Sequence, residues 1–182
     1  MNDNELMLKV KQGDFEKLGL IYERHKKRLY NYFYKLNNDS ELSKDLVQNV
    51  FIRVLKFKHK YKDKGEESFI SWLFKIARNE NYTHYRKSKK HLEKVEFKTE
   101  NHNDLIVEAL DKKILLNEEK KLLKIALNRL SENKKEVLIL SKYQELPYRD
   151  IAKILNCTEA SVKVQVYRAL KELKIIMQKL NI

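Results

Sequence analysis

Hydrophobic residues recur at intervals of three and four along most of the chain, which is the spacing of one face of an α-helix. The pattern runs through residues 5–36, 41–61, 66–90 and 119–182, and no stretch stands out as a β-strand. Only three glycines and one proline interrupt it. Because both residues break helices, their scarcity favours long helices over many tight turns. The chain is therefore predicted to be all-α.

Two polar segments divide the first half of the chain. Gly13 and Asp14 are suited to end one helix and cap the next. Residues 37–40, Asn-Asn-Asp-Ser, are a loop that ends in good N-cap residues, with Glu41 in the first turn of the following helix. At about 100° per residue, one side of that helix is a wide apolar core face. It consists of Leu46, Val47, Val50, Phe51, Val54 and Leu55.

The opposite side of the same helix is polar apart from one residue. It carries Asp45, Gln48, Asn49 and Ile52. An isoleucine among polar groups indicates either a docking surface or a single exposed apolar side chain, which any protein tolerates. From the residues alone the second interpretation is favoured.

The chain is strongly basic, with a formal net charge of +13. Such a charge attracts polyanions, most often nucleic acid and less often an anionic membrane. Residues 75–91 contain six basic residues against one acidic residue, and aromatic residues lie among and before them. Aromatic rings can stack on unpaired bases while cations follow the phosphates, so this segment suits single-stranded nucleic acid.

A simpler alternative is that the apolar residues of this segment are core. That alternative is expected to hold for most of them, including Phe69, Leu73, Ile76 and Ala77. It is weakest for Trp72 and for the polar-face residues Asn79, Tyr82, Arg86 and Lys87.

Residues 91–118 differ from the rest in composition. They hold seven acidic and four basic residues, and the hydrophobic period is broken. We interpret them as a flexible acidic linker, with some helix near its end, between one domain at 1–90 and another at 119–182.

Residues 147–177 have the pattern of a helix-turn-helix. A short helix begins at Pro147, since proline is well placed in a first turn, and residues 156–158 make the turn. Thr158 or Ser161 is expected to cap the second helix, and Cys157 to be a small buried apolar group. The second helix has one apolar face, made of Val162, Val166, Ala169, Leu170 and Leu173.

The other face of that second helix suits the major groove. It offers Lys163, Val164, Tyr167, Arg168 and Lys171. Cations neutralise phosphates or pair with guanine edges, and the apolar members can contact thymine methyl groups. The alternative, an ordinary helical hairpin with a solvated basic face, is disfavoured by the compact spacing, the turn and the charge.

Several classes of protein are excluded by what the sequence lacks. No apolar run approaches the roughly 18 residues that a membrane span needs, and the polar, acidic N-terminus is not a signal peptide. With Cys157 as the one cysteine, no internal disulfide is possible, and the cytoplasm is the simplest location. No P-loop, HExxH or paired-cysteine motif is present, and the five histidines are scattered and expected to be solvated. We expect no enzyme, cofactor or metal site.

Three stretches in order resemble the extracytoplasmic-function sigma factors of the sigma-70 family. Region 2.2 of that family resembles residues 42–55, LSKDLVQNVFIRVL. Region 2.3 running into 2.4 resembles residues 68–79, SFISWLFKIARN. Region 4.2 resembles residues 146–173, LPYRDIAKILNCTEASVKVQVYRALKEL.

The resemblance implies two helical domains with distinct partners. The first would dock on the clamp helices of the largest subunit of bacterial RNA polymerase and would open and hold the −10 promoter element. The second would bind the polymerase flap and the −35 duplex, and the linker would thread toward the active-site and RNA-exit channels. An anti-sigma factor is a further candidate partner. The rival hypothesis is a stand-alone helix-turn-helix repressor or activator, which would bind operator DNA without polymerase.

The resemblance also assigns roles to residues. The polymerase-docking face would be Asp45, Gln48, Asn49 and Ile52, although family members usually carry Glu where Asn49 stands. Contacts to −10 DNA would come from Phe69, Trp72, Arg78, Asn79, Tyr82, Arg86 and Lys87. Asn79 aligns with the loop and helix start that capture a flipped base. Contacts to −35 DNA would come from Lys163, Val164, Tyr167, Arg168 and Lys171.

Overall fold

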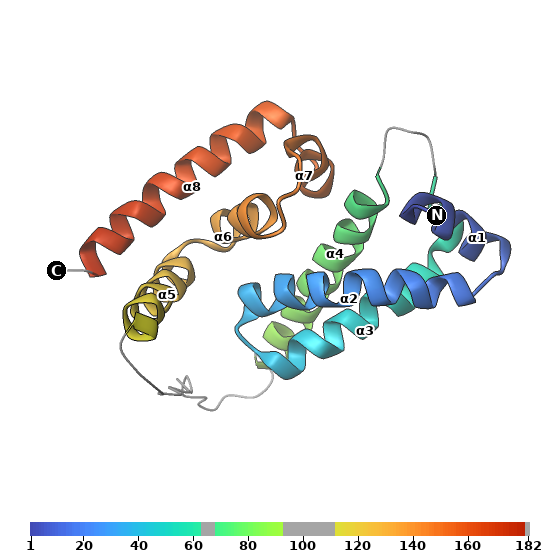
Figure 1. Ribbon diagram of the computed structural model, residues 1–182, viewed down its shortest axis with the longest axis horizontal. Helices are drawn as coiled ribbons and strands as arrows, with labels where there is room; N and C mark the ends of the chain where they lie inside the picture. Colours follow the sequence, from blue (N-terminus) through green and yellow to red (C-terminus); the bar gives the residue numbers. More distant parts are fainter. Residues whose placement is uncertain (63–67, 93–111, 181–182) are drawn as a thin grey trace.

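The computed structural model describes residues 1–62, 68–92 and 112–180, and within these ranges it contains helices and no strand. The first half of the chain folds into a bundle that we call the N-terminal domain (Figure 1). Its helices are α1 (Asp3–Gln12), α2 (Glu16–Asn37), α3 (Ser40–Lys56), the 3-10 turn η1 (Lys58–Lys60) and α4 (Phe69–Leu92).

The second half forms a separate group of helices, which we call the C-terminal domain (Figure 1). Its elements are α5 (Lys112–Arg129), α6 (Glu132–Leu138), the π-helix η2 (Ile139–Tyr143), α7 (Tyr148–Leu155) and α8 (Glu159–Leu180). The all-α, two-domain prediction is confirmed. Most of the predicted linker, residues 93–111, lies outside the described residues, and α5 begins within the predicted linker range, at Lys112.

Local signals set the helix boundaries of the N-terminal domain. Gly13 ends α1 at φ 108°, a left-handed conformation that costs glycine little because it has no Cβ. The predicted break there is confirmed, but Asp14 does not cap α2, whose N-cap is Phe15 with no side-chain hydrogen bond. Asn38 ends α2 at φ 56°, and the Asp39 carboxylate accepts a 3.0 Å hydrogen bond from Leu42 N at the start of α3.

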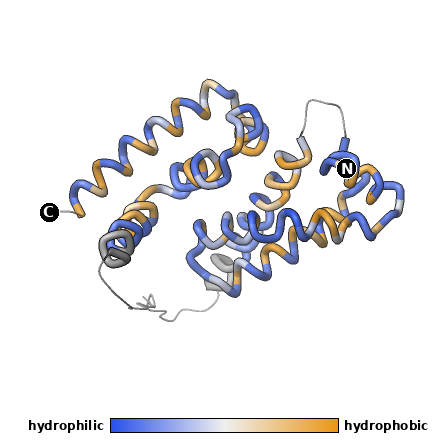
Figure 2. Tube along the Cα trace, in the orientation of Figure 1, coloured by the Kyte–Doolittle hydropathy of each residue, from blue (hydrophilic) through white to orange (hydrophobic). Residues whose placement is uncertain are grey.

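The amphipathic pattern correctly identified most of the core. On α3 the buried residues include Leu46, Val47, Val50, Phe51 and Val54. The assignment of Leu55 to the core face is wrong, because 39% of this side chain is exposed. Figure 2 shows hydrophobic residues concentrated in the first half of α4, where this helix enters the core.

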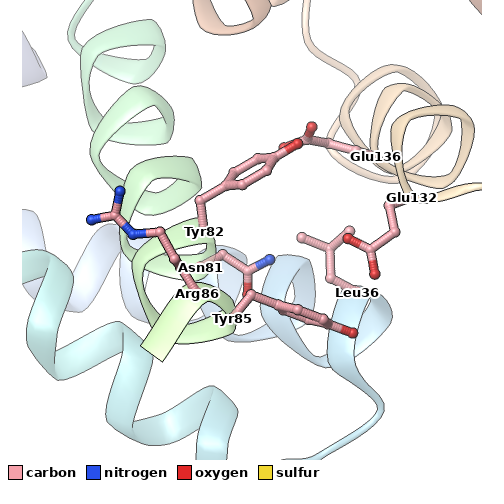
Figure 3. A pocket seen from close by; sticks show the side chains of 7 residues that line it. All are labelled: Leu36, Asn81, Tyr82, Tyr85, Arg86, Glu132 and Glu136. Carbon is pink, nitrogen blue, oxygen red and sulfur yellow. The ribbon is translucent and has the colours of Figure 1, made fainter. Parts of the chain in front are cut away.

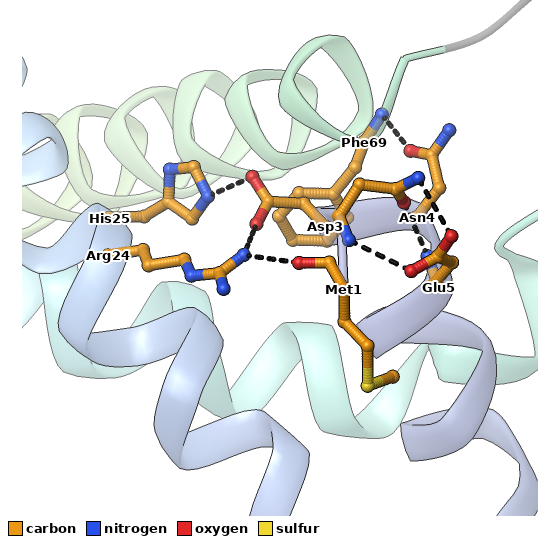
Figure 4. Close-up of polar contacts among 8 residues, drawn as sticks. Met1, Asp3, Asn4, Glu5, Arg24, His25 and Phe69 are labelled. Atoms are coloured by element: carbon orange, nitrogen blue, oxygen red, sulfur yellow. Dashed lines mark hydrogen bonds and ion pairs between the residues drawn. The ribbon is translucent and has the colours of Figure 1, made fainter.

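Polar contacts fasten α1 to the rest of the N-terminal domain (Figure 4). The Asp3 carboxylate pairs with His25 Nε2 at 2.7 Å and with Arg24 at 2.8 Å. Burial raises the pKa of Asp3, but these hydrogen bonds lower it more, so it lies below its usual value. His25 is 7% exposed, so the expectation that the histidines are solvated is wrong for this residue. The polar contacts of this region join α1 to other helices: Asn4, which follows Asp3, accepts a 3.0 Å hydrogen bond from Phe69 N at the start of α4. We therefore assign His25 a structural role.

The two domains touch along one side of the N-terminal bundle. Helix α4 packs against α7, and α2 packs against α6 and η2. In Figure 1, α7 lies beside the first turns of α4, while α8 extends away from the N-terminal domain. This arrangement decides which surfaces remain open.

Candidate nucleic-acid interface

Helices α7 and α8 form the predicted helix-turn-helix. Helix α7 begins directly after Pro147 and ends at Leu155, and the next residue, Asn156, turns the chain with φ 55°. Thr158 is the cap of α8, because its hydroxyl accepts a 3.1 Å hydrogen bond from Ser161 N. Cys157 in the turn is half-buried rather than fully buried. The sequence therefore specified this motif from its local signals.

One face of α8 packs inward and the other lies open. Val162, Val166 and Ala169 are buried, whereas Leu170 is 39% exposed, so its assignment to the core is wrong. Tyr167 is 68% exposed and Val164 is 46% exposed. All five predicted −35 contacts lie on the exposed face, namely Lys163, Val164, Tyr167, Arg168 and Lys171. A DNA duplex therefore has free access to this face.

The aromatic–basic segment is one continuous helix, α4. Asn79 lies well inside it, so the expectation that Asn79 belongs to a loop and helix start is wrong. Two polar contacts hold this part of α4 against its neighbours. Glu80 pairs with Arg53 of α3 at 2.7 Å, and Asn81 accepts a 2.9 Å hydrogen bond from Asn37 of α2. Asn79 itself is left exposed beside these anchors.

The exposed side of α4 combines a ring with cations. Tyr82 is 47% exposed, and the Arg78 guanidinium lies 4.9 Å from the centre of its ring. Arg86 and Lys87 are exposed one turn further along. We call Arg78, Asn79, Tyr82, Arg86 and Lys87 the α4 face; together they offer a stacking surface bordered by positive charge.

Phe69 and Trp72 are packed inside the N-terminal domain. Phe69 is 2% exposed and Trp72 is 8% exposed. Their rings meet that of Tyr61, with centroid distances of 6.0 Å for Phe69 and 5.1 Å for Trp72. The core alternative, which the sequence favoured for Phe69 and supported least for Trp72, therefore holds for both residues.

The polar side of α3 is solvent-exposed, as its pattern predicted. Asp45, Gln48, Asn49 and Ile52 are all exposed, and 63% of Ile52 is accessible. We call these four residues the α3 face. An isoleucine this open, with polar residues around it, is suited to a partner surface.

Two glutamates of α6 that face α4 were not predictable from the sequence pattern. A pocket of about 340 Å³ lies between the domains, with Glu132 and Glu136 of α6 opposite Tyr82 and Tyr85 of α4, while the Arg86 guanidinium points away from the two carboxylates (Figure 3). Glu136 is only 6% exposed. Periodicity alone cannot find such residues, since only the packing of two distant segments brings them together.

The part of the chain that the structure describes contains neither a cluster of metal-ligating side chains nor a membrane-spanning helix. No group of three or more His, Cys, Asp or Glu side chains is placed to hold a metal ion there. No helix within the same residues is long and apolar enough to cross a membrane.

A helical two-domain protein with one helix-turn-helix and an aromatic–basic helix belongs to the class of DNA-binding transcription proteins. Comparison with protein families narrows this class. Residues 21–91 match sigma-70 region 2, and residues 121–173 match sigma-70, region 4. The chain belongs to the extracytoplasmic-function group of the sigma-70 family. It is a sigma factor, which directs promoter-specific transcription by RNA polymerase.

Individual relatives agree with this assignment. The extracytoplasmic-function sigma factor SigM of Bacillus subtilis is 29% identical over 156 residues, which cover 86% of this chain and 92% of SigM. CnrH, solved in complex with the cytosolic domain of CnrY, is 18% identical with a TM-score of 0.72 and covers 97% of both chains. RpoE of Bartonella quintana, solved with the anti-sigma factor NepR, is 23% identical with a TM-score of 0.67 and covers 88% of this chain and 96% of its own.

Proposed function

We propose that three exposed faces divide the work of promoter recognition. The α3 face would bind core polymerase, the α4 face would hold the −10 strand, and the exposed side of α8 would read the −35 duplex. The observation that carries this proposal is their separation: each face lies on a different helix, and each has the chemistry that its partner requires. The domains proposed to carry them are residues 1–90 and 119–182, with residues 91–118 between them.

The α3 face suits a protein partner rather than DNA. It has one carboxylate, two amides and one open isoleucine, and no cation. A phosphate backbone would gain little from such a surface, whereas a protein interface combines an apolar anchor with polar contacts around it. We therefore assign polymerase binding to Asp45, Gln48, Asn49 and Ile52.

The α4 face suits unpaired bases. Tyr82 offers a ring for stacking, and Arg78, Arg86 and Lys87 provide charge for the phosphates. Extruding a base from a duplex costs a few kcal/mol, which stacking at about 1–3 kcal/mol per base can offset. The exposed Asn79 amide would hydrogen-bond a base edge, while the buried Phe69 and Trp72 would act only through the packing of the first turn of α4.

The exposed side of α8 suits a major groove. A recognition helix presents one face of cations and small apolar groups while its other face packs on the preceding helix. Lys163, Arg168 and Lys171 are free for phosphates or guanine edges, and Val164 and Tyr167 for thymine methyl groups. The rest of the C-terminal domain would contact the polymerase flap.

An anti-sigma factor is a further proposed partner. CnrH and RpoE, whose folds this chain shares, were solved with protein partners, NepR being named an anti-sigma factor. The exposed α3 face is one surface that such a partner could block. In this proposal the chain performs no covalent chemistry; it contributes binding energy that places polymerase at a promoter and favours its melted form.

In vitro transcription tests the proposal. Start sites mapped after overexpression supply a candidate promoter, and purified core polymerase is then assayed on it with and without the protein. We expect transcription only with both present. Failure of the protein to bind core polymerase would refute the proposal. A gel shift distinguishes this proposal from the rival hypothesis of a stand-alone repressor, because such a repressor would bind the promoter duplex tightly without polymerase.

A further inference from the structure

A second cavity lies where the end of α2 meets the C-terminal domain. Its volume is about 430 Å³, which is larger than that of the pocket beside α4. The last turn of α2 lines one side, and α5 with the end of η2 lines the other. No residue of the α3 face, the α4 face or the exposed side of α8 lines it. Cavities of this size are typical of small-molecule sites, so its chemistry indicates what it can bind.

Much of the cavity lining is apolar. Leu123 and Leu127 of α5 contribute aliphatic surface, and Leu127 is only 7% exposed. The rings of Tyr34 and Tyr143 also line the cavity, and both are partly exposed. Covering this surface with a ligand would contribute about 25 cal/mol for each Å² of apolar area removed from water. The cavity therefore suits a ligand with an apolar body.

The charged part of the lining is entirely positive. Lys35, Lys120 and Lys124 line the cavity, and no lining residue is acidic. None of these lysines forms an ion pair with another residue that the structure describes. The pocket beside α4 differs, since Glu132 and Glu136 line it. Like charges gathered without a counter-ion repel one another, and an anion bound among them would relieve this repulsion.

Two of the three ammonium groups lie against tyrosine rings. Lys35 Nζ is 3.7 Å from the centre of the Tyr143 ring, and Lys124 Nζ is 5.7 Å from the centre of the Tyr34 ring. Such contacts position a cation without neutralising it, so N–H donors remain for a ligand. Burial lowers the pKa of Lys35, which shows that its charge is partly removed from water.

A fourth lysine lies next to the cavity. Lys135 Nζ donates to the Leu36 carbonyl and to the Asn128 side-chain oxygen, both at 2.7 Å. Burial lowers the pKa of Lys135; the charge of Glu132 opposes this, and the charge of Lys124 adds to it. Repulsion between Lys124 and Lys135 is the mark of a site with excess positive charge.

We propose that this cavity binds a small amphipathic anion, a molecule with one carboxylate or phosphate group and an apolar chain or ring. The lysines hold the anionic group, while Leu123 and Leu127 contact the apolar body. Inorganic phosphate leaves the apolar lining uncovered, and a neutral hydrocarbon leaves the cations without a partner. Because α2 belongs to one domain and α5 to the other, binding is coupled to the relative placement of the two domains.

Calorimetric titration of the full chain tests the ligand class. The probes are decanoate and decyl phosphate, which share an apolar chain and differ in the anionic group. We expect at least one of them to bind at a single site, with decanol and inorganic phosphate at least about tenfold weaker. Binding of one decyl anion alone identifies the preferred anionic group. Equal binding of decanol or of inorganic phosphate would overturn the proposal, and so would failure of both decyl anions to bind.

Two pairs of variants on α5 test the location. Lys124→Gln should weaken binding of the decyl anion about tenfold, whereas Lys121→Gln, at an exposed lysine outside the lining, should change it less than about twofold. Leu123→Trp places a larger side chain in the lining and should abolish binding, whereas the half-buried Leu122 lies outside the lining and Leu122→Trp should not.

Thermal unfolding establishes that each variant is folded, and the lysine pair remains decisive if a tryptophan variant is not. Equal binding by Lys124→Gln and Lys121→Gln would overturn the site. Failure of the wild type to bind core polymerase would instead refute the proposed function and leave this site unaffected, so the two failures are distinguishable.

Discussion

Ile52→Ala tests the α3 face at its most exposed apolar side chain. Burying a whole isoleucine contributes about 1.5–3 kcal/mol. Because 63% of Ile52 is accessible in the free protein, docking can bury at most about two-thirds of that value. Alanine retains only Cβ, so we expect the substitution to cost about 1–1.5 kcal/mol of binding, or about five- to twelvefold in the dissociation constant.

A displacement assay measures this directly. Unlabelled variants compete with fluorescently labelled wild-type protein for core polymerase, and anisotropy reports the fraction bound. Leu20→Ala is the matched control, since this leucine of α2 is also exposed, at 49%, and lies on neither the α3 face nor the α4 face. Both variants should unfold like the wild type, because exposed substitutions usually change stability by less than about 0.5 kcal/mol. If Ile52→Ala displaces the label as well as the control does, the α3 face is not the docking surface.

Three further predictions concern the other surfaces. Arg168→Ala should weaken binding to −35 duplex and reduce the salt slope by about one, whereas Arg129→Ala, at an exposed arginine of α5, should do neither; unchanged binding across salt concentrations would remove Arg168 from the interface. Asn79→Ala should slow formation of heparin-resistant open complexes more than it weakens core binding, and normal opening would contradict its role. Because the pKa of Asp3 lies below its usual value, its carboxylate stabilises the fold above about pH 4 and loses that contribution as the pH falls through the folded-state pKa. The urea midpoint of Asp3→Asn should therefore fall less steeply on acidification than the midpoint of the wild type.

Helix boundaries were predictable where a local signal sets them. Gly13, Asp39 and Thr158 end or cap helices through contacts within a few residues, and such contacts are encoded in the neighbouring sequence. The exposed faces of α3 and α8 were predictable for a similar reason, since helical periodicity determines which side chains share a side. Periodicity did not set the width of the buried face, and so Leu55 and Leu170 were wrongly placed in the core.

Features that depend on distant segments were not predictable. The π-helix η2 closes with a bond from Gln144 N to Ile139 O, and Gln144 then contacts Arg28, more than a hundred residues earlier in the chain. The pattern left open whether Trp72 is part of the core, and its packing against Tyr61 and Phe69 decides that it is. Glu136 lies on a short helix with no recognisable motif, and its importance comes entirely from its partners on α2 and α4.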